Sequence, residues 1–223
     1  MPEAITHSTK RDIKSQAILD MAEKLFSTKG YGNVKVDEIA KQVGISKGSV
    51  FFYFKSKENL HMALTYRAFQ SLVDAYYDSV EKNQGKNGLE KTTALIQAYL
   101  DFGKQHPYYY ELLLDYMSFI RSEVNQNMTP AMQESIYFRK VKGIHNLPLS
   151  IVVEEIERGQ KDGSILNKKD PNLLYLTAWA MVIGFSKLGM ASHNETFFKV
   201  PIPTLRDHIL EIVHKLLLDQ STL

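Results

Sequence analysis

The sequence contains no cysteine among its 223 residues. This absence excludes disulfide bonds, cysteine nucleophiles and thiolate metal sites, and it is compatible with a reducing compartment, so we expect a cytoplasmic protein. Residues 1–14 are polar and charged and hold no apolar stretch, so we also expect no secretory signal peptide.

Motifs of catalysis and cofactor binding are also missing. The sequence has no glycine-rich phosphate loop and no Gly-x-Ser-x-Gly motif. Its seven histidines include no pair at the i, i+4 spacing of a helical metal site, and they are His7, His61, His106, His145, His193, His208 and His214. We therefore expect no catalytic residues, no metal site and no cofactor, with each histidine in the core or on the surface.

Proline is absent between Pro2 and Pro107, and no strand pattern is as clear as the helical pattern. Apolar residues recur instead at helical spacing. Ile18, Ala22 and Phe26 mark one face of a first helix that ends at Gly30, and a later helix runs to about residue 82. With 44% hydrophobic and 23% charged residues, the composition is globular, and the predicted fold class is all-α.

The rest of the chain contains further helix boundaries. We predict a turn at 84–88, a helix over 89–105 and the start of another helix at 106–107. A loop is predicted over 121–130, followed by a helix over 132–159 that is interrupted near Pro148. Further helices are predicted to start at Asp170–Pro171 and at a capping box over 204–207, which opens the last helix.

The segment from Leu173 to Ala191 is almost continuously apolar, which raises the question of a membrane span. It contains Thr177, Ser186 and Lys187, and the sequence offers no second span. A helix that is apolar all round is otherwise covered on both sides. We expect no membrane contact, with one side of this helix on its own domain and the other on a second subunit.

The net charge of +2 is small, but it is unevenly distributed. Residues 1–60 sum to +3 and the remaining residues to −1. After Glu38 the acids stop, while Lys41, Lys47, Lys55 and Lys57 follow. A local basic stretch of this kind suits a small DNA-contact surface, and the alternative is an ordinary solvated face.

Residues 36–54 have the pattern of a helix-turn-helix. Gly44 supplies the positive φ that a tight turn between two helices requires, and Ala40 is small where the helices cross. Ser46 is placed to cap the second helix. In such motifs the N-terminal residues of the second helix meet the base edges of DNA. The alternative is a helical hairpin with an ordinary polar face.

The predicted DNA-contact residues gather on and around this second helix. Lys57 belongs to them because a cation in the first turn of a helix opposes the helix dipole, unless a phosphate binds there. The full predicted set is Lys35, Ser46, Lys47, Gly48, Ser49, Phe51, Phe52, Tyr53, Lys55 and Lys57.

Residues 11–60 resemble the TetR family of transcriptional regulators. The shared residues are Leu25–Phe26, Gly30–Tyr31, Ile39–Ala40, Gly44–Gly48, Tyr53–Phe54 and Ser56–Leu60. Two departures stand out. Val34–Lys35 replaces the family's two threonines before the second helix, and Phe51–Phe52 replaces its tyrosine and histidine. These changes put in doubt a hydroxyl cap and a tyrosyl contact, although either phenylalanine could touch a thymine methyl or pack in the core.

The resemblance implies nine or ten helices in two domains. Residues 1–56 would form the helix-turn-helix DNA-binding domain, and residues 57–223 a helical ligand-binding and dimerisation domain. The last two long helices would form a four-helix bundle in a homodimer. A small-molecule effector would release the dimer from a palindromic operator in double-stranded DNA.

Aromatic residues in the second domain predict a largely apolar pocket, suited to an aromatic or lipid-like effector, although such residues more often belong to a core. The predicted lining is Tyr66, Phe69, Tyr99, Phe102, Tyr109, Leu113, Met117 and Trp179. The predicted dimer interface is Leu176, Ile183, Leu205, Ile209, Ile212 and Leu216.

Two other functions compete with a ligand-responsive repressor. A small helical enzyme is disfavoured because the sequence supplies no nucleophile, metal or cofactor signature. A helical binding or adaptor module of the same fold, without DNA binding, is disfavoured by Lys47, Gly48 and Lys57, whereas Val34–Lys35 and Phe51 leave room for it.

Overall fold

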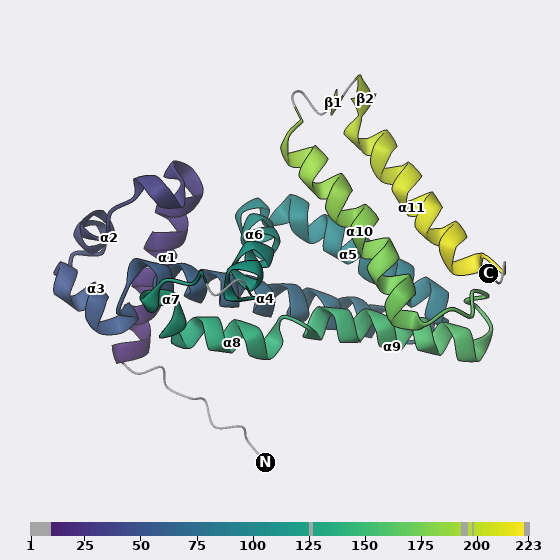
Figure 1. Cartoon of the computed structure of the whole chain (residues 1–223), viewed down its shortest axis with the longest axis horizontal. Coiled ribbons are helices and arrows are strands. Elements are labelled where there is room, and N and C mark those ends of the chain that lie inside the picture. The colour runs from purple at the N-terminus through teal and green to yellow at the C-terminus, as the bar shows by residue number, and fades with distance from the viewer. Residues whose placement is uncertain (1–9, 125–126, 193–195, 198, 221–223) are drawn as a thin grey trace, which may run out of the picture. The chain divides into compact units, whose positions relative to one another are not determined.

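The computed structural model describes residues 10–124, 127–192, 196–197 and 199–220, and they are mainly helical (Figure 1). The all-α class is therefore confirmed. The expectation of no signal peptide concerns residues that lie largely outside the described part, as do His7 and His193.

The chain forms two compact units by its internal contacts. Unit 1 comprises Met1–Gln70 and His106–His145, and unit 2 comprises Ser71–Gln105 and Asn146–Leu223. The long helix α4 contributes to both. These two units differ from the predicted DNA-binding domain (residues 1–56) and ligand-binding domain (residues 57–223). The functional division between residues 56 and 57 stays a prediction.

The helices of unit 1 begin with the helix-turn-helix. They are α1 (Lys10–Lys29), the 3₁₀ turn η1 (Tyr31–Asn33), α2 (Val36–Val43), α3 (Lys47–Phe54), the first part of α4 (Lys57–Lys82), α6 (Pro107–Val124), α7 (Pro130–Gln133) and α8 (Ile136–Ile144). Unit 2 adds to the rest of α4 the elements α5 (Gly88–Gln105), α9 (Leu147–Asp162), α10 (Pro171–Met190), β1 (Thr196–Phe197), β2 (Val200–Pro201) and α11 (Ile202–Leu218).

The turn between α2 and α3 has the predicted geometry. Gly44 adopts φ 74°, and its backbone N–H closes the end of α2. Ser46 caps α3 by accepting a hydrogen bond from the backbone N–H of Ser49 at 3.1 Å. Ile39 and Val50 are buried with Phe26 of α1, so apolar burial holds the three helices together. The helix-turn-helix prediction is confirmed.

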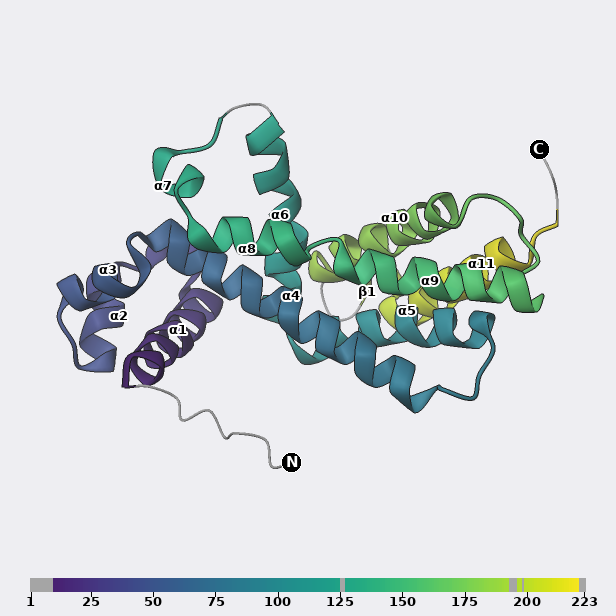
Figure 2. The same cartoon turned by 90° about the horizontal axis from the view of Figure 1, so that it is seen from below.

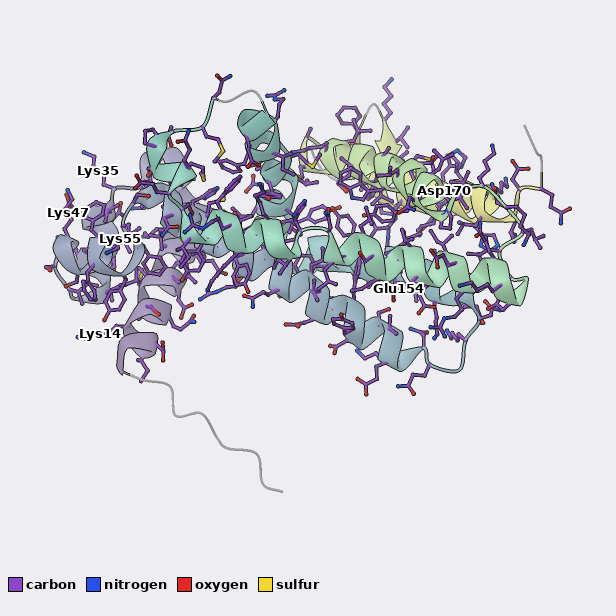
Figure 3. The ribbon with its side chains drawn as sticks, turned by 60° about the horizontal axis from the view of Figure 1, so that its bottom comes forward. Lys14, Lys35, Lys47, Lys55, Glu154 and Asp170 are labelled. Atoms are coloured by element: carbon purple, nitrogen blue, oxygen red, sulfur yellow. The ribbon has the colours of Figure 1, made fainter. Side chains whose placement is uncertain are left out.

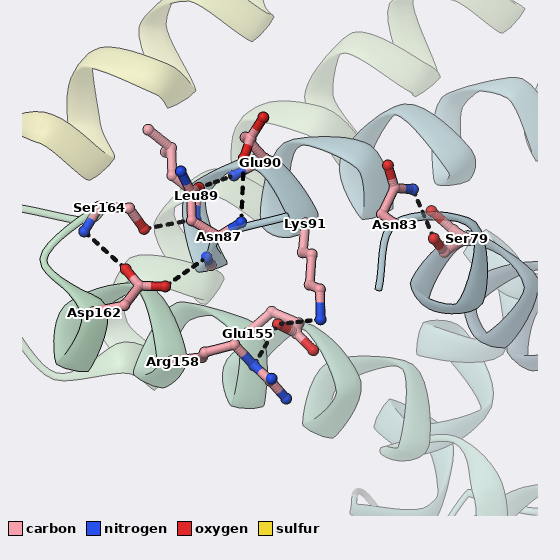
Figure 4. Close-up of polar contacts among 11 residues, drawn as sticks. Ser79, Asn83, Asn87, Leu89, Glu90, Lys91, Glu155, Arg158, Asp162 and Ser164 are labelled. Atoms are coloured by element: carbon pink, nitrogen blue, oxygen red, sulfur yellow. Dashed lines mark hydrogen bonds and ion pairs between the residues drawn. The ribbon is translucent and has the colours of Figure 1, made fainter. Parts of the chain in front are cut away.

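In unit 2, α5 and α9 pack at very short range, side by side (Figure 2). A Cβ on Gly88 would lie 2.1 Å from the backbone nitrogen of Gly159, so only glycine fits there. Two side chains from the end of α9 and the turn after it cap α5 (Figure 4). The carboxylate of Asp162 accepts from the N–H of Gly88 at 2.9 Å, and Ser164 Oγ accepts from the N–H of Leu89 at 3.0 Å.

Helix α10 starts as predicted and lies beside α9 and α11 in unit 2. Asp170 accepts hydrogen bonds from the backbone N–H groups of Asn172 and Leu173 at 2.8 and 3.1 Å. These bonds lower the pKa of the Asp170 carboxyl, and the bond from the N–H of Leu173 has the largest effect. By length and composition, α10 is the one helix in the described residues that could cross a membrane, and only 22% of its most apolar window is buried.

Several predicted boundaries are wrong. The capping box at 204–207 does not form, because α11 already begins at Ile202 behind Pro201 with no side-chain cap, and the flanking prolines fix a helical φ. Helix α6 extends through residues predicted as a loop and ends at Val124. The predicted helix over 132–159 breaks near Pro148 as expected, but also at Ser135. A ribbon of two short antiparallel strands, β1 and β2, was not predicted.

Candidate nucleic-acid interface and ligand cavity

The exposed face of α3 begins with three small or flexible residues. Gly48 is exposed, and a Cβ built on it would meet only Ser46 Oγ, at 3.8 Å. The hydroxyls of Ser46 and Ser49 lie 2.9 Å apart. Lys47 is exposed and forms an ion pair of 3.0 Å with Asp37. This face can therefore approach a base edge closely while it offers hydroxyls and a cation.

A hollow of about 330 Å³ lies against this face of α3. Its lining residues are Lys14, Ile45, Ser46, Gly48, Ser49, Phe52 and Tyr53. Lys14 comes from α1 and was not in the predicted set. No spacing rule in the sequence connects an exposed residue of α1 with α3, so only the folded arrangement identifies it.

The two phenylalanines of α3 have different surroundings. Phe51 is half-buried, whereas 60% of Phe52 is exposed. The ring of Phe52 meets Tyr53 edge to face at 5.3 Å, and Lys55 Nζ lies 5.8 Å from its centre. Phe52 is thus an apolar group held out toward solvent beside a cation. The structure favours it over Phe51 for contact with a thymine methyl.

Lysines surround the three N-terminal helices of unit 1. Figure 3 shows Lys14, Lys35, Lys47 and Lys55 at this end of the unit, and all four are exposed. Val34 is buried and Lys35 makes no side-chain hydrogen bond that caps α2, so the hydroxyl cap that the resemblance places here is absent. The side chain of Lys35 is exposed to solvent. An array of exposed cations of this kind attracts a phosphate backbone.

Lys57 is half-buried and faces the turn after α1. Its ammonium donates to the backbone carbonyl of Tyr31 at 2.5 Å and lies 4.2 Å from the centre of the Tyr31 ring. Ser56 caps α4 by accepting from the N–H of Asn59 at 3.0 Å. Lys57 therefore fastens α4 to the 3₁₀ turn, and a phosphate contact would compete with this bond.

Asn59 connects α3 to α8 through its buried side chain. Its amide donates to the carbonyl of Phe54, the last residue of α3, at 2.7 Å. Its carbonyl accepts from Ser135 Oγ at 2.6 Å and, at a longer 3.4 Å, from the N–H of Tyr137. Ser135 in turn caps α8 by accepting from the N–H of Phe138 at 3.0 Å. This chain of bonds accounts for the helix break at Ser135 and holds the C-terminal end of α3.

His61 lies in an aromatic cluster behind the helix-turn-helix. Its ring contacts Phe26, Tyr31 and Phe119, and its Nδ1 has no hydrogen-bond partner among the described residues. Burial lowers the pKa of His61 to about 4; nearby Asp115 opposes this shift and Lys57 adds to it. His61 is therefore neutral at pH 7.

Unit 2 contains an inner cavity with about 30 Å³ of free space. Its lining comes from α4, α5, α9, α10 and α11, and comprises Tyr76, Thr92, Ile96, Tyr99, Val152, Ile156, Tyr175, Ala178, Trp179, Val182, Val213 and Leu217. Burial raises the pKa of the Tyr175 hydroxyl to about 12. The cavity is apolar and far smaller than the roughly 300–1,000 Å³ of a drug-sized site. A ligand of that size enters only if lining side chains move.

Two of the predicted pocket residues line this cavity, namely Tyr99 and Trp179. Phe102 is also in unit 2 but does not line it. The other five lie in unit 1: Tyr66 is half-buried, Phe69 and Leu113 are buried, Tyr109 donates to Glu23 at 2.8 Å, and 48% of Met117 is exposed. Tyr76 and Tyr175 were missed because helix spacing alone does not tell which aromatic faces meet.

The predicted dimer residues lie on α10 and α11. Leu176 is 48% exposed, and Ile183, Leu205, Ile209, Ile212 and Leu216 are half-buried. Further exposed apolar side chains on α10 are Leu173, Leu188 and Met190. The opposite side of α10 lines the cavity through Tyr175, Ala178, Trp179 and Val182.

Comparison with known proteins identifies the helix-turn-helix. Residues 18–64 match the family of bacterial regulatory proteins described as the tetR family. The chain is 33% identical to the HTH-type transcriptional regulator YuxN of Bacillus subtilis, over 54% of this chain and 38% of YuxN. It is 27% identical to IcaR of Staphylococcus aureus, the negative transcriptional regulator of the biofilm operon icaADBC, over 87% of this chain and 97% of IcaR.

The fold is shared over nearly the whole length of a solved structure. AibR, crystallised with isovaleryl coenzyme A and operator DNA, superposes with a TM-score of 0.64 at 14% identity, over 89% of this chain and 97% of AibR. This likeness concerns the fold alone, and the aligned part spans well under half of YuxN. The matched motif and the geometry of α2 and α3 together identify residues 18–64 as a helix-turn-helix of the kind found in the tetR family of bacterial regulatory proteins.

Proposed function

We propose that the protein is a homodimeric transcriptional repressor that binds a palindromic operator and leaves it when a small, largely apolar effector binds unit 2. The exposed face of α3 carries this proposal. Gly48 leaves room for close approach, Ser49 and Lys47 offer a donor and a cation, and Phe52 offers an apolar contact. These are the contacts with which a recognition helix reads the major groove.

The relatives support both halves of the proposal. IcaR is a negative regulator and aligns over most of this chain. AibR shares the fold and was crystallised with an operator and an acyl coenzyme A. A DNA-binding regulator of this kind works in the cytoplasm and needs no catalytic group.

Two-fold symmetry follows from the proposed dimer. Two copies of α3 would enter successive major grooves on one face of the duplex, about 34–36 Å apart. Their target would be an inverted repeat. The exposed apolar side chains of α10 are the proposed contact between subunits, because soluble monomers rarely expose a large apolar patch.

The test compares two glycine-to-valine variants in DNA binding. Gly48→Val places a branched side chain on the exposed face of α3, and Gly143→Val does the same on the exposed face of α8, where a Cβ would meet nothing within 4 Å. Binding is measured by fluorescence anisotropy, with an inverted repeat from the DNA upstream of the gene. We expect Gly48→Val to lose operator binding while it stays folded and dimeric, and Gly143→Val to bind as the wild type does.

Equal operator affinity for Gly48→Val and the wild type would remove α3 as the reading head. The competing function, a helical adaptor of the same fold, would show no salt-dependent DNA binding in either variant or in the wild type.

A further inference from the structure

One hydroxyl in the inner cavity of unit 2 lacks a partner. Thr92 is 1% exposed, and its Oγ1 makes no hydrogen bond to any residue that the structure describes. A threonine in a helix commonly bonds to the carbonyl four residues earlier. Thr93, the next residue, does so with Leu89 at 2.8 Å, and Thr177 on α10 does so with Leu173 at 2.8 Å. Thr92 lines the cavity instead.

The same cavity offers no charge to a ligand. Its lining in the described part of the chain contains no acid, lysine, arginine or histidine. Charged residues next to the lining residues in the sequence form ion pairs with one another (Figure 4). Glu155 Oε2 lies 2.9 Å from Arg158 Nε and 4.0 Å from Lys91 Nζ. An ionised group inside the cavity would lose its hydration without a counter-ion. A cation would find only aromatic faces, those of Tyr76, Tyr99, Tyr175 and Trp179.

We propose that this cavity binds an uncharged, largely apolar molecule whose one polar group, a hydroxyl, carbonyl or amide, pairs with Thr92 Oγ1. This inference rests on the proposed function and names the chemistry of its effector. A buried polar atom without a partner destabilises the empty state, and a ligand that supplies the partner recovers that free energy. The apolar lining favours the rest of the molecule by excluding water.

The limited free space determines how such a molecule enters. About 30 Å³ accommodates little more than water, so the ligand must displace side chains. Tyr175 and Trp179 are only half-buried and both belong to α10. Together with half-buried Ile96 of α5, they are the lining residues with room to move toward solvent. Trp179 is also the one tryptophan of the sequence, so its fluorescence reports events in this cavity.

The experiment titrates the full-length protein, without DNA, with four probes. Three share a methylated ring: 4-methylphenol is neutral with a hydroxyl, toluene has no polar group, and 4-methylbenzoate is an anion. The fourth, tetramethylammonium, is a cation suited to aromatic faces. Binding is followed by the emission of Trp179. We expect 4-methylphenol to bind most tightly and the two ions not to compete with it.

Three variants distinguish a hydrogen bond from Thr92 to the ligand from a purely structural role of this residue. Thr92→Val keeps the shape of the side chain and removes the hydroxyl, and we expect it to weaken 4-methylphenol roughly 2–10-fold while toluene binds at least as well as before. Thr93→Val, the matched control, should change neither affinity. Ala178→Phe fills the cavity and should abolish binding of both probes.

Several results would overturn the proposal. Equal losses for 4-methylphenol and toluene in Thr92→Val would make the hydroxyl structural only. Tighter binding of 4-methylbenzoate or tetramethylammonium would refute the argument from charge. A wild-type protein that binds its operator but none of the neutral probes would refute the cavity as an effector site and leave the DNA-binding function intact.

Discussion

The side chain of Asn59 fastens the recognition helix, and its removal is the most direct test of how α3 is held. Asn59→Ala deletes the donor to the carbonyl of Phe54 and the acceptor for Ser135 Oγ, and both partners belong to buried residues. The carbonyl of Phe54 still accepts from the N–H of Ser56, and Ser135 Oγ still accepts from the N–H of Phe138, so neither partner is left without a hydrogen bond. The loss of two buried hydrogen bonds at about 0.5–1.5 kcal/mol each gives an expected loss of about 1–3 kcal/mol in the free energy of unfolding. For a protein of this size, that corresponds to a fall in Tm of roughly 2–12 °C.

The control is Asn83→Ala, just past the other end of α4. Asn83 is half-buried and donates one local hydrogen bond, to the carbonyl of Ser79 at 2.7 Å. Its loss should stay below about 1.5 kcal/mol. Thermal unfolding followed by circular dichroism measures both variants. A loss for Asn59→Ala no larger than that for Asn83→Ala would refute the view that the buried connection holds these helices.

A second measurement separates stability from positioning. Operator affinity is measured well below the Tm of each variant. Asn59→Ala should bind DNA more weakly, because the C-terminal end of α3 loses its anchor. Ser135→Ala leaves the bond to Phe54 in place, so it should lower stability with little effect on operator affinity.

Four further outcomes are expected. Gly88→Ala forces α5 and α9 apart and should cost at least about 1–3 kcal/mol in unfolding experiments, whereas Gly85→Ala, which meets nothing within 4 Å, should cost little. The pKa of His61 is lowered to about 4, so the unfolded state takes up a proton before the folded state does as pH falls. The free energy of unfolding should therefore be constant above pH 6.5 and fall by roughly 3 kcal/mol between pH 6.5 and 4. Urea titrations at several pH values should show a smaller fall for His61→Gln. If Phe52 touches a thymine methyl, replacing one thymine per half-site by uracil should weaken operator binding of the wild type roughly 4-fold for each methyl removed. The same replacement should leave the operator affinity of Phe52→Ala unchanged. An equal loss of affinity in both proteins would show that the methyl contacts another residue. Leu176→Glu should give monomers in sedimentation at micromolar concentration, and an intact dimer would exclude the exposed face of α10 as the interface.

The helix-turn-helix could be predicted from the sequence because its determinants are local. Gly44 sets the turn and Ser46 caps the next helix, and both act within a few residues of their partners. The cavity could not be predicted in the same way. Tyr76 and Tyr175 are 99 positions apart and meet only through the packing of unit 2, so their spacing carries no signal.

The boundary errors have a similar origin. Thr204 has the right neighbours for a cap, but the chain is already helical two residues earlier because of its prolines. Lys14 was missed as a candidate contact because the direction in which a residue of α1 points depends on how α1 packs, which a single helix does not encode.

Helix α10 presents its two sides to two different proposed tasks, since Trp179 faces the cavity while Leu176 is exposed among apolar neighbours. If the effector shifts α10 side chains and the second subunit covers the other side, the two equilibria are linked by one coupling free energy. Thermodynamic reciprocity then requires that an effector that weakens the dimer must itself bind more weakly as the protein becomes more concentrated. In the cell, the abundance of the protein would thus set the effector concentration at which the proposed repressor responds.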